Sequence, residues 1–277
     1  MSERRACGAL KIHRTAYRYE PVKRADEDEL KQQIIEYACK YGAYGYRMVT
    51  GLVRNKNELF NATKSETEES KPVPNHKRVF RIWQEEGLKV PKKQQKRRRL
   101  WLNDGSCIRL RPEYRNQVWS YDFIEDKVGG KKCRWLNVID EYTRVPLFSE
   151  PRRSWRKNAV IEVLANLIIT HGAPEYIRSD NGPEFTAKKL IKWLATAGIT
   201  TMFIEPGSPW ENGYCESFNA RMRNEFLNRE QFDNMYEAQV LTRRWIKEYT
   251  TLRPHSSLGY KPPAPESFTP VISLSAS

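Results

Sequence analysis

The sequence has few of the residues that hold small secreted domains together or bind soft metals. Its five cysteines lie far apart and never form a Cys-x-x-Cys pair, and only four histidines are present. This pattern argues against a disulfide framework and against a zinc module. The sequence also lacks a signal-peptide core and any apolar run of about 18 residues. We therefore predict a soluble, cytoplasmic protein with no membrane partner.

Negative charge is scarce relative to positive charge, and the imbalance is uneven along the chain. The 277 residues carry a formal net charge of +14, and residues 1–110 hold 25 Lys and Arg against 14 Asp and Glu. Lysine and arginine displace condensed counterions from phosphates, so this excess suits a polyanionic partner. A solvated basic surface is the alternative that composition alone leaves open.

Residues 1–88 are predicted to form a small all-helical module. Apolar residues recur at a helical period within 26–41 and again within 48–53, and a third helix is expected over 77–86. The first two periods are joined by a glycine-bearing turn, which makes the segment a candidate for a helix-turn-helix-like DNA-binding module. An ordinary helical hairpin fits the period alone slightly better. A polar loop is expected at about 55–75.

Residues 89–114 are predicted to be a basic linker. Six cations with no periodic apolar partner stand in it: Lys92, Lys93, Lys96, Arg97, Arg98 and Arg99. We expect them to contact DNA phosphates, which would position the protein without reading the bases. A plain solvated linker and a nuclear-import signal are the alternatives.

Residues 115–232 change in character to strands alternating with helices. Three strands are expected in succession, with a hairpin turn at Gly129–Gly130. A helix, a strand, a second helix, a strand and a helix beginning at Pro209 follow them. This order is typical of a mixed α/β domain. Residues 233–277 are expected to add one helix and a proline-rich tail.

Three carboxylates in this domain are candidates for catalysis. Asp122 ends an apolar strand pattern, Asp180 ends a short strand, and Glu216 lies on the polar face of a helix. Carboxylates that converge from separate elements are the hard oxygen ligands that divalent cations prefer. We predict that the three bind two Mg²⁺ ions, with Mn²⁺ able to substitute. Such a pair can clamp the attacking and leaving oxygens of a phosphodiester.

Asp140 also ends an apolar strand pattern and competes with Asp122 for the first place in this set. It is followed directly by the turn Glu141–Arg144. An aspartate in such a turn commonly binds its own backbone. We therefore prefer Asp122.

Five sequence motifs resemble those of the DDE transposases encoded by the second reading frame of two-frame bacterial insertion sequences. They occur in the family's order: Trp119-x-x-Asp122, residues 136–144, residues 179–185, Asn212-Gly213-x-x-Glu216-Ser217-Phe218, and Arg253-Pro254-His255-x-x-Leu258-Gly259-Tyr260. The resemblance covers nearly the whole chain. It implies a ribonuclease H-like catalytic core of the retroviral-integrase superfamily, with a mixed five-stranded sheet.

The resemblance also implies an activity and partners. The enzyme would be a polynucleotidyl transferase that cleaves double-stranded DNA at mobile-element ends and joins it to a target, with Asp122, Asp180 and Glu216 as catalytic residues and metal ligands. We expect a homo-oligomer on DNA, associated with the nucleoid, acting with the first reading-frame product or as a frameshift fusion with it. A non-catalytic DNA-binding regulator and a structure-selective nuclease of the same fold are the alternatives.

Three further residues are expected to contact DNA: Asn181, Asn219 and Arg223. Arg223 matches the family's basic residue near the DNA, and helical geometry puts it on one stripe with Asn219 and Glu216. The alternative for Arg223 is a surface ion pair with a glutamate of its own helix, Glu225 or Glu230.

Overall fold

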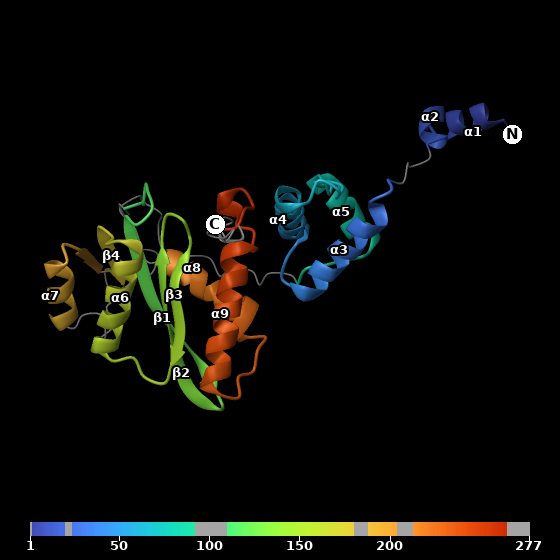
Figure 1. The fold of residues 1–277 in the computed structure, drawn as a ribbon. Coiled ribbons are helices and arrows are strands. Elements are labelled where there is room, and N and C mark those ends of the chain that lie inside the picture. Colours follow the sequence, from blue (N-terminus) through green and yellow to red (C-terminus); the bar gives the residue numbers. More distant parts are fainter. Residues whose placement is uncertain (1, 20–23, 92–109, 180–187, 204–212, 265–277) are drawn as a thin grey trace, which may run out of the picture.

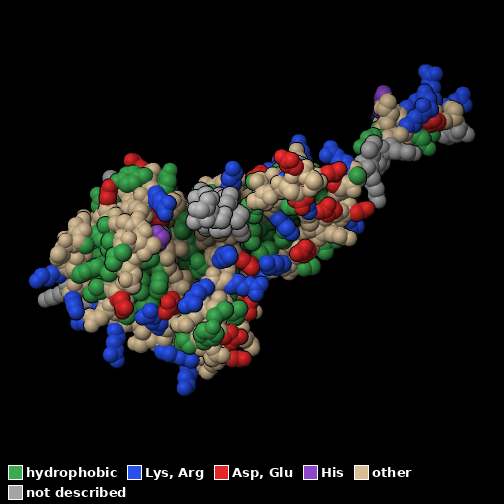
Figure 2. All heavy atoms as spheres, in the orientation of Figure 1, with side chains coloured by type: hydrophobic (Ala, Val, Ile, Leu, Met, Phe, Trp, Pro, Cys, Tyr) green, Lys and Arg blue, Asp and Glu red, His purple; other side chains and the backbone are tan. Residues whose placement is uncertain are grey.

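The computed structural model describes five segments of the chain: residues 2–19, 24–91, 110–179, 188–203 and 213–264. A group of helices from the second segment lies beside a sheet domain built from the later ones, and the two helices of the first segment stand apart from both (Figure 1). Lys and Arg side chains crowd the first two helices and recur over the sheet domain (Figure 2). None of the helices in these five segments is long and apolar enough to cross a membrane.

The sheet has five strands: β1 (Val118–Val128), β2 (Lys131–Asp140), β3 (Pro146–Arg152), β4 (Tyr176–Ser179) and β5 (Thr200–Phe203). Their order is β3-β2-β1-β4-β5. The three long strands pair antiparallel, whereas β4 pairs parallel with β1 and β5 pairs parallel with β4. The expected mixed five-stranded sheet is therefore confirmed.

The hairpin between β1 and β2 turns at the two expected glycines. Gly129 has a φ of 55° and Gly130 a φ of 71°. A two-residue hairpin turn of this kind requires a positive φ at both positions, which glycine adopts without strain. At Gly129 a Cβ would also lie 2.7 Å from the backbone oxygen of Asp233, so no other residue fits there.

Strand β1 continues beyond the point at which the sequence pattern suggested that it ends. Asp122 was expected at the end of the strand, but β1 runs on to Val128. Its outer half, 125–127, pairs with residues 132–134 of β2 and is largely exposed. Charged side chains stand on the exposed face of this two-stranded arm, while Val128 and Cys133 on its other face are buried in the second core. The run of charged residues interrupts the apolar pattern, which therefore underestimated the strand's length.

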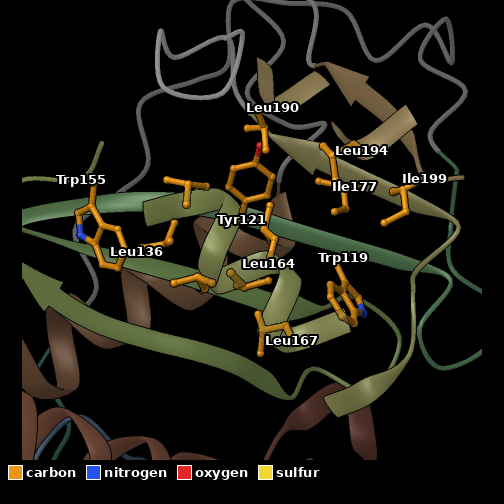
Figure 3. Close-up of a cluster of buried hydrophobic side chains, with 13 residues drawn as sticks. Trp119, Tyr121, Leu136, Trp155, Leu164, Leu167, Ile177, Leu190, Leu194 and Ile199 are labelled. Atoms are coloured by element: carbon orange, nitrogen blue, oxygen red, sulfur yellow. The ribbon is translucent and has the colours of Figure 1, made fainter. Parts of the chain in front are cut away.

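Alternation along β1 separates two apolar cores. Trp119 and Tyr121 face α6 (Lys157–His171) and α7 (Lys188–Thr196), and their cluster with Leu164 is drawn in Figure 3. Successive side chains of a strand point to opposite faces. Asp122 therefore shares the other face with Ile124, which packs in the second core.

The second core lies against three consecutive helical elements: α8 (Gly213–Met222), the π-helix η2 (Arg223–Leu227) and α9 (Met235–Thr251). Phe218 and Trp245 are among the side chains that fill it. Aromatic rings dominate here, and the ring centroids of these two residues are 5.7 Å apart. A short 3-10 helix, η3 (Ser256–Leu258), follows near the end of the described chain.

Five helices precede the sheet: α1 (Glu3–Ala9), α2 (Arg14–Tyr17), α3 (Glu27–Lys40), α4 (Tyr46–Thr63) and α5 (His76–Glu85). Helices α3, α4 and α5 share one apolar cluster and correspond to the three expected helices. We call them the helical module. The apolar period did not predict α1 and α2.

The polar loop expected at about 55–75 is wrong in its first part, because α4 continues to Thr63. Two asparagines one helical turn apart explain the extension. The side-chain amides of Asn57 and Asn61 each donate at 2.8 Å to the backbone carbonyls of residues 71–72. Polar side chains here hold a returning segment onto the helix, a use that hydropathy alone does not reveal.

The helical module contacts the part of the sheet domain that holds the second core, through buried polar groups. The Tyr44 hydroxyl donates to Glu225 at 2.8 Å, and Glu225 also accepts two hydrogen bonds of 2.7 Å from Arg253. Tyr41 donates to Glu248 of α9 at 3.2 Å. The module thus contacts the helices that follow directly after α8.

Candidate active site

Asp122 is held by a side chain from a distant helix. Its Oδ2 accepts a hydrogen bond of 2.9 Å from the Nδ2 of Asn219 on α8, and its Oδ1 accepts one of 2.7 Å from the backbone amide of Phe123. Asn219 is buried, whereas Asp122 is half-buried. The carboxylate is therefore fixed in direction while part of it still reaches solvent.

A row of neutral polar groups stands behind this contact. The Oδ1 of Asn219 accepts from the Nδ2 of Asn137 at 2.7 Å, and the Oδ1 of Asn137 accepts from the Oγ of Ser149 at 2.7 Å. The strand register explains the row, because Asp122 lies opposite Asn137 and Asn137 lies opposite Ser149. Three neighbouring strands and α8 thus contribute one group each.

Glu216 reaches the same region along α8. It is exposed and stands three residues before Asn219. Residues three apart on a helix lie on one face. The contact between Asn219 and Asp122 therefore brings the helix face that bears Glu216 to β1. The strand that bears Asp122 and the helix that bears Glu216 are thus in contact, although they lie far apart in the sequence.

Asp180 lies outside the described residues. Strand β4 ends one residue earlier, at Ser179, and runs parallel to β1 with Arg178 opposite Ser120. The carboxyl end of β4 thus points along β1 toward Asp122. Within the described segments there is no cluster of three or more His, Cys, Asp or Glu residues that could hold a metal.

Asp140 has a structural role, as the sequence predicted. It is 1% exposed, and its carboxylate accepts from the backbone amide of Tyr142 at 3.2 Å and from the Oγ1 of Thr143 at 2.7 Å. The expectation that it binds its own turn is confirmed. The next residue, Glu141, is completely buried and accepts two hydrogen bonds of 2.8 Å from Arg178.

Arg223 makes a different contact from the one offered as its alternative. Its Nη2 donates to the backbone oxygen of Glu125 at 2.8 Å, and its Nη1 lies 3.9 Å from the carboxylate of Asp126. It forms no ion pair with the glutamates of its own helix, one of which, Glu225, pairs with Arg253. The arginine side chain is 44% exposed beside the arm of β1.

The remaining expected DNA contacts divide into two groups. Asn219 is described, and both ends of its amide are engaged inside the protein, with Asp122 and Asn137. Asn181 and the six linker cations fall outside the described residues: Lys92, Lys93, Lys96, Arg97, Arg98 and Arg99.

Sequence reasoning missed Asn137 and Ser149. The only signal for them was a pair of polar residues in otherwise apolar strands. That signal becomes informative once the strand register is known, because the register aligns both residues with Asp122. A buried asparagine in a central strand is costly unless its amide is satisfied.

Two segments match models of the integrase core domain, residues 112–209 and residues 197–263. The chain is 32% identical over 265 residues to an uncharacterized 39.2 kDa protein of insertion element IS476 from Xanthomonas euvesicatoria, covering 95% of this chain and 72% of that protein. It is 30% identical over 265 residues to an uncharacterized 31.7 kDa protein of insertion element IS407 from Burkholderia multivorans, covering 95% and 90%.

A further relative and a solved structure are less similar. Transposase InsD of insertion element IS2 from Escherichia coli is 24% identical over 247 residues, covering 86% of this chain and 78% of that protein. A chain of the simian T-cell lymphotropic virus intasome is 16% identical with a TM-score of 0.49, covering 72% and 69%. On the strength of the insertion-element relatives and the integrase core matches, this chain belongs to the DDE transposases of bacterial insertion sequences, within the retroviral-integrase superfamily.

Proposed function

We propose that this transposase cleaves DNA at the ends of a mobile element and joins them to a target, using Asp122, Asp180 and Glu216. One observation carries the proposal. Asn219, three residues after Glu216 on α8, donates a hydrogen bond to Asp122. This contact fixes the helix with the third carboxylate against the strand with the first.

The donor set fits hard divalent cations. Asp122, Glu216 and Asp180 offer only carboxylate oxygens, and no His or Cys is needed to complete the set. Family membership supports a requirement for a divalent metal, and we propose two Mg²⁺ ions with Mn²⁺ as a substitute. When bound, such ions supply Lewis-acid stabilisation of the charge that develops on the phosphodiester oxygens.

The protein's own contribution is orientation. Asn219 fixes the plane of the Asp122 carboxylate, and Asn137 and Ser149 fix Asn219 in turn. Groups that support metal ligands in this way commonly change activity by about 10- to 100-fold when they are removed. Because the whole row is neutral, it orients the Asp122 carboxylate without adding a charge beside it.

Arg223 is suited to hold a phosphate next to these carboxylates. Its guanidinium is held by the Glu125 carbonyl, lies 3.9 Å from the Asp126 carboxylate, and is still 44% exposed. A planar guanidinium can bind two phosphate oxygens at once, which lysine cannot do. We propose that it contacts the DNA beside the scissile phosphate.

The partners follow from the same assignment. Family membership supports DNA binding and assembly into oligomers on DNA. We propose that the DNA is double-stranded, that the chain assembles as a homo-oligomer associated with the nucleoid, and that the first reading-frame product or a fusion with it takes part. Asn181 and the six cations of the linker are proposed as further DNA contacts.

The test is a two-step assay with purified protein, labelled duplexes that carry the element ends, and Mg²⁺. Wild-type protein should produce both cleaved ends and joined products, and chelation should stop both. Asp180→Asn and Glu216→Gln should remove both products and keep DNA binding, whereas Glu150→Gln, a change at a partly exposed position of β3, should keep all three. A structure-selective nuclease would cleave without joining. A regulator would bind DNA and yield neither product.

A further inference from the structure

The side of α8 that turns away from Asp122 borders an open groove. Two hollows of about 520 and 740 Å³ adjoin there and share part of their walls. We call them together the α8 groove. Its polar lining includes Arg111, Arg144, Ser217, Arg221, His255 and Ser256. None of these residues contacts Asp122.

Helical geometry separates the groove from the catalytic face while keeping both on one element. Ser217 and Arg221 are four residues apart and form one stripe of α8, about 100° around the helix from Glu216. Glu216 and Asn219 lie on the other stripe. A ligand in the groove would therefore run alongside the helix that carries the third proposed catalytic carboxylate.

The charge of the groove is positive and only partly compensated. Its two carboxylates are engaged elsewhere: Asp140 binds its own turn and Glu225 pairs with Arg253. Arg144 stacks on the ring of Tyr214, with its guanidinium carbon 3.6 Å from the ring centroid.

Two other arginines of the groove have no acidic partner in the part of the chain that the structure describes. Arg111 and Arg221 are both exposed, and neither forms an ion pair with a described residue. Each guanidinium presents a planar set of N–H donors to the groove. This geometry suits phosphate oxygens.

His255 supplies an independent sign of a missing ligand. It lines both hollows and is 8% exposed, and its Nε2 is buried with no hydrogen-bond partner among the described residues. Buried polar atoms are normally satisfied, so an unsatisfied one next to a cavity indicates a partner beyond the residues that the structure describes. Burial, together with Arg253, Arg144 and Arg221, lowers the pKa of His255 to about 3. Its ring is therefore neutral near pH 7. The nearby arginines make the local potential positive, and a bound anion would offset that potential.

The described ends of the basic linker adjoin this groove. Val90 and Pro91 line one hollow, and Arg111 lines the other. The six linker cations fall within 92–109, outside the described residues.

We propose that the α8 groove binds the phosphodiester backbone of a DNA strand next to the reacting end. Arg111 and Arg221 pair with the phosphates. His255 and Ser256 form hydrogen bonds with the phosphate oxygens. The proposal rests on the proposed function in that DNA is the substrate of both sites. It assigns the groove to positioning, because contacts with phosphates carry no sequence information.

The experiment measures binding of full-length protein to a fluorescent element-end duplex across a series of salt concentrations, without divalent metal. The double variant Arg111→Ala/Arg221→Ala should bind more weakly, and the slope of log Kd against log salt should fall by about one for each arginine. The matched control is Arg243→Ala, which removes an exposed arginine of α9 outside the groove. It should leave affinity and slope at the wild-type values.

His255→Gln gives a second, independent readout. The ring is neutral near pH 7, so this variant should lose affinity with no change of slope. Wild-type affinity and slope in the double variant would overturn the proposal. A change in self-association without a change in DNA binding would also overturn it, because the groove would then be a contact between copies of the chain. Because no chemistry is measured, a failure of Asp122 or Glu216 as catalytic groups would leave these results unaffected.

Discussion

Asp122 and Asp140 lie on neighbouring strands and have opposite surroundings. Asp140 is buried, and its carboxylate is satisfied by the turn that follows it. Asp122 is half-buried, and an asparagine from α8 holds it from across the second core. A carboxylate satisfied locally stabilises the fold. One that is oriented by a distant element, with part of its surface open, is set up to bind something else.

The side chains next to the two aspartates also differ, because they are charged beside Asp140 and neutral beside Asp122. The residue after Asp140 is Glu141, which forms a buried ion pair with Arg178. Behind Asp122 stand the neutral side chains of Asn137 and Ser149. These neutral side chains orient the carboxylate without adding a charge beside it.

The largest expected effect is the difference between Asp122→Asn and Asp140→Asn. Asp122→Asn removes the charge of a proposed metal ligand at nearly constant volume, so joining should fall by at least about 10²-fold, the scale of losing one preorganised electrostatic group. Asp140→Asn should lower the melting temperature and keep measurable joining in the folded fraction. Single-turnover joining and thermal unfolding of both variants test this. Joining by Asp122→Asn at the wild-type rate would reject its role.

The second prediction concerns the buried ion pair. Glu141→Gln leaves the guanidinium of Arg178 buried without a counter-charge, which typically costs about 3–5 kcal/mol of unfolding free energy. Denaturant unfolding measures the loss. The control is Glu150→Gln, whose partner Arg152 is partly exposed, and it should cost no more than about 1 kcal/mol. Equal losses of unfolding free energy in the two variants would show that the ion pair of Glu141 and Arg178 is effectively solvated.

The third prediction separates two roles for Asn219. If it orients Asp122, Asn219→Ala should reduce joining by about 10- to 100-fold and leave metal-free DNA affinity unchanged. If it instead contacts DNA, as the sequence suggested, affinity should fall in step with the rate. Anisotropy without metal and single-turnover joining on the same preparation distinguish the two roles.

The sequence predicted elements well where one local pattern was sufficient. Alternation at Trp119 and Tyr121 with the turn at Gly129–Gly130 predicted the first hairpin, and the turn after Asp140 correctly identified that residue as structural. Asn137 was missed because its importance depends on which residue faces it across the strands, and a local pattern carries no register. Extrapolating the helical period to Arg223 did not anticipate η2, a π-helix with a different angular step.

The smallest expected effect tests how far the row behind Asp122 reaches. Ser149 touches Asp122 only through Asn137 and Asn219, so each link allows some relaxation. Ser149→Ala leaves the buried Oδ1 of Asn137 without its donor, which should cost about 1–3 kcal/mol of unfolding free energy, while joining should fall by no more than about tenfold.

Ser149→Thr keeps the hydroxyl and is the matched variant, because a β-branched residue is readily accommodated in a strand. It should restore the joining rate, measured in single turnover on folded protein. A rate for Ser149→Ala as low as that of Asn219→Ala would mean that the row moves as one rigid unit. A wild-type joining rate for Ser149→Ala together with reduced stability would mean that the residues that orient Asp122 extend no further than Asn137. Strand β3 would then contribute to the fold alone.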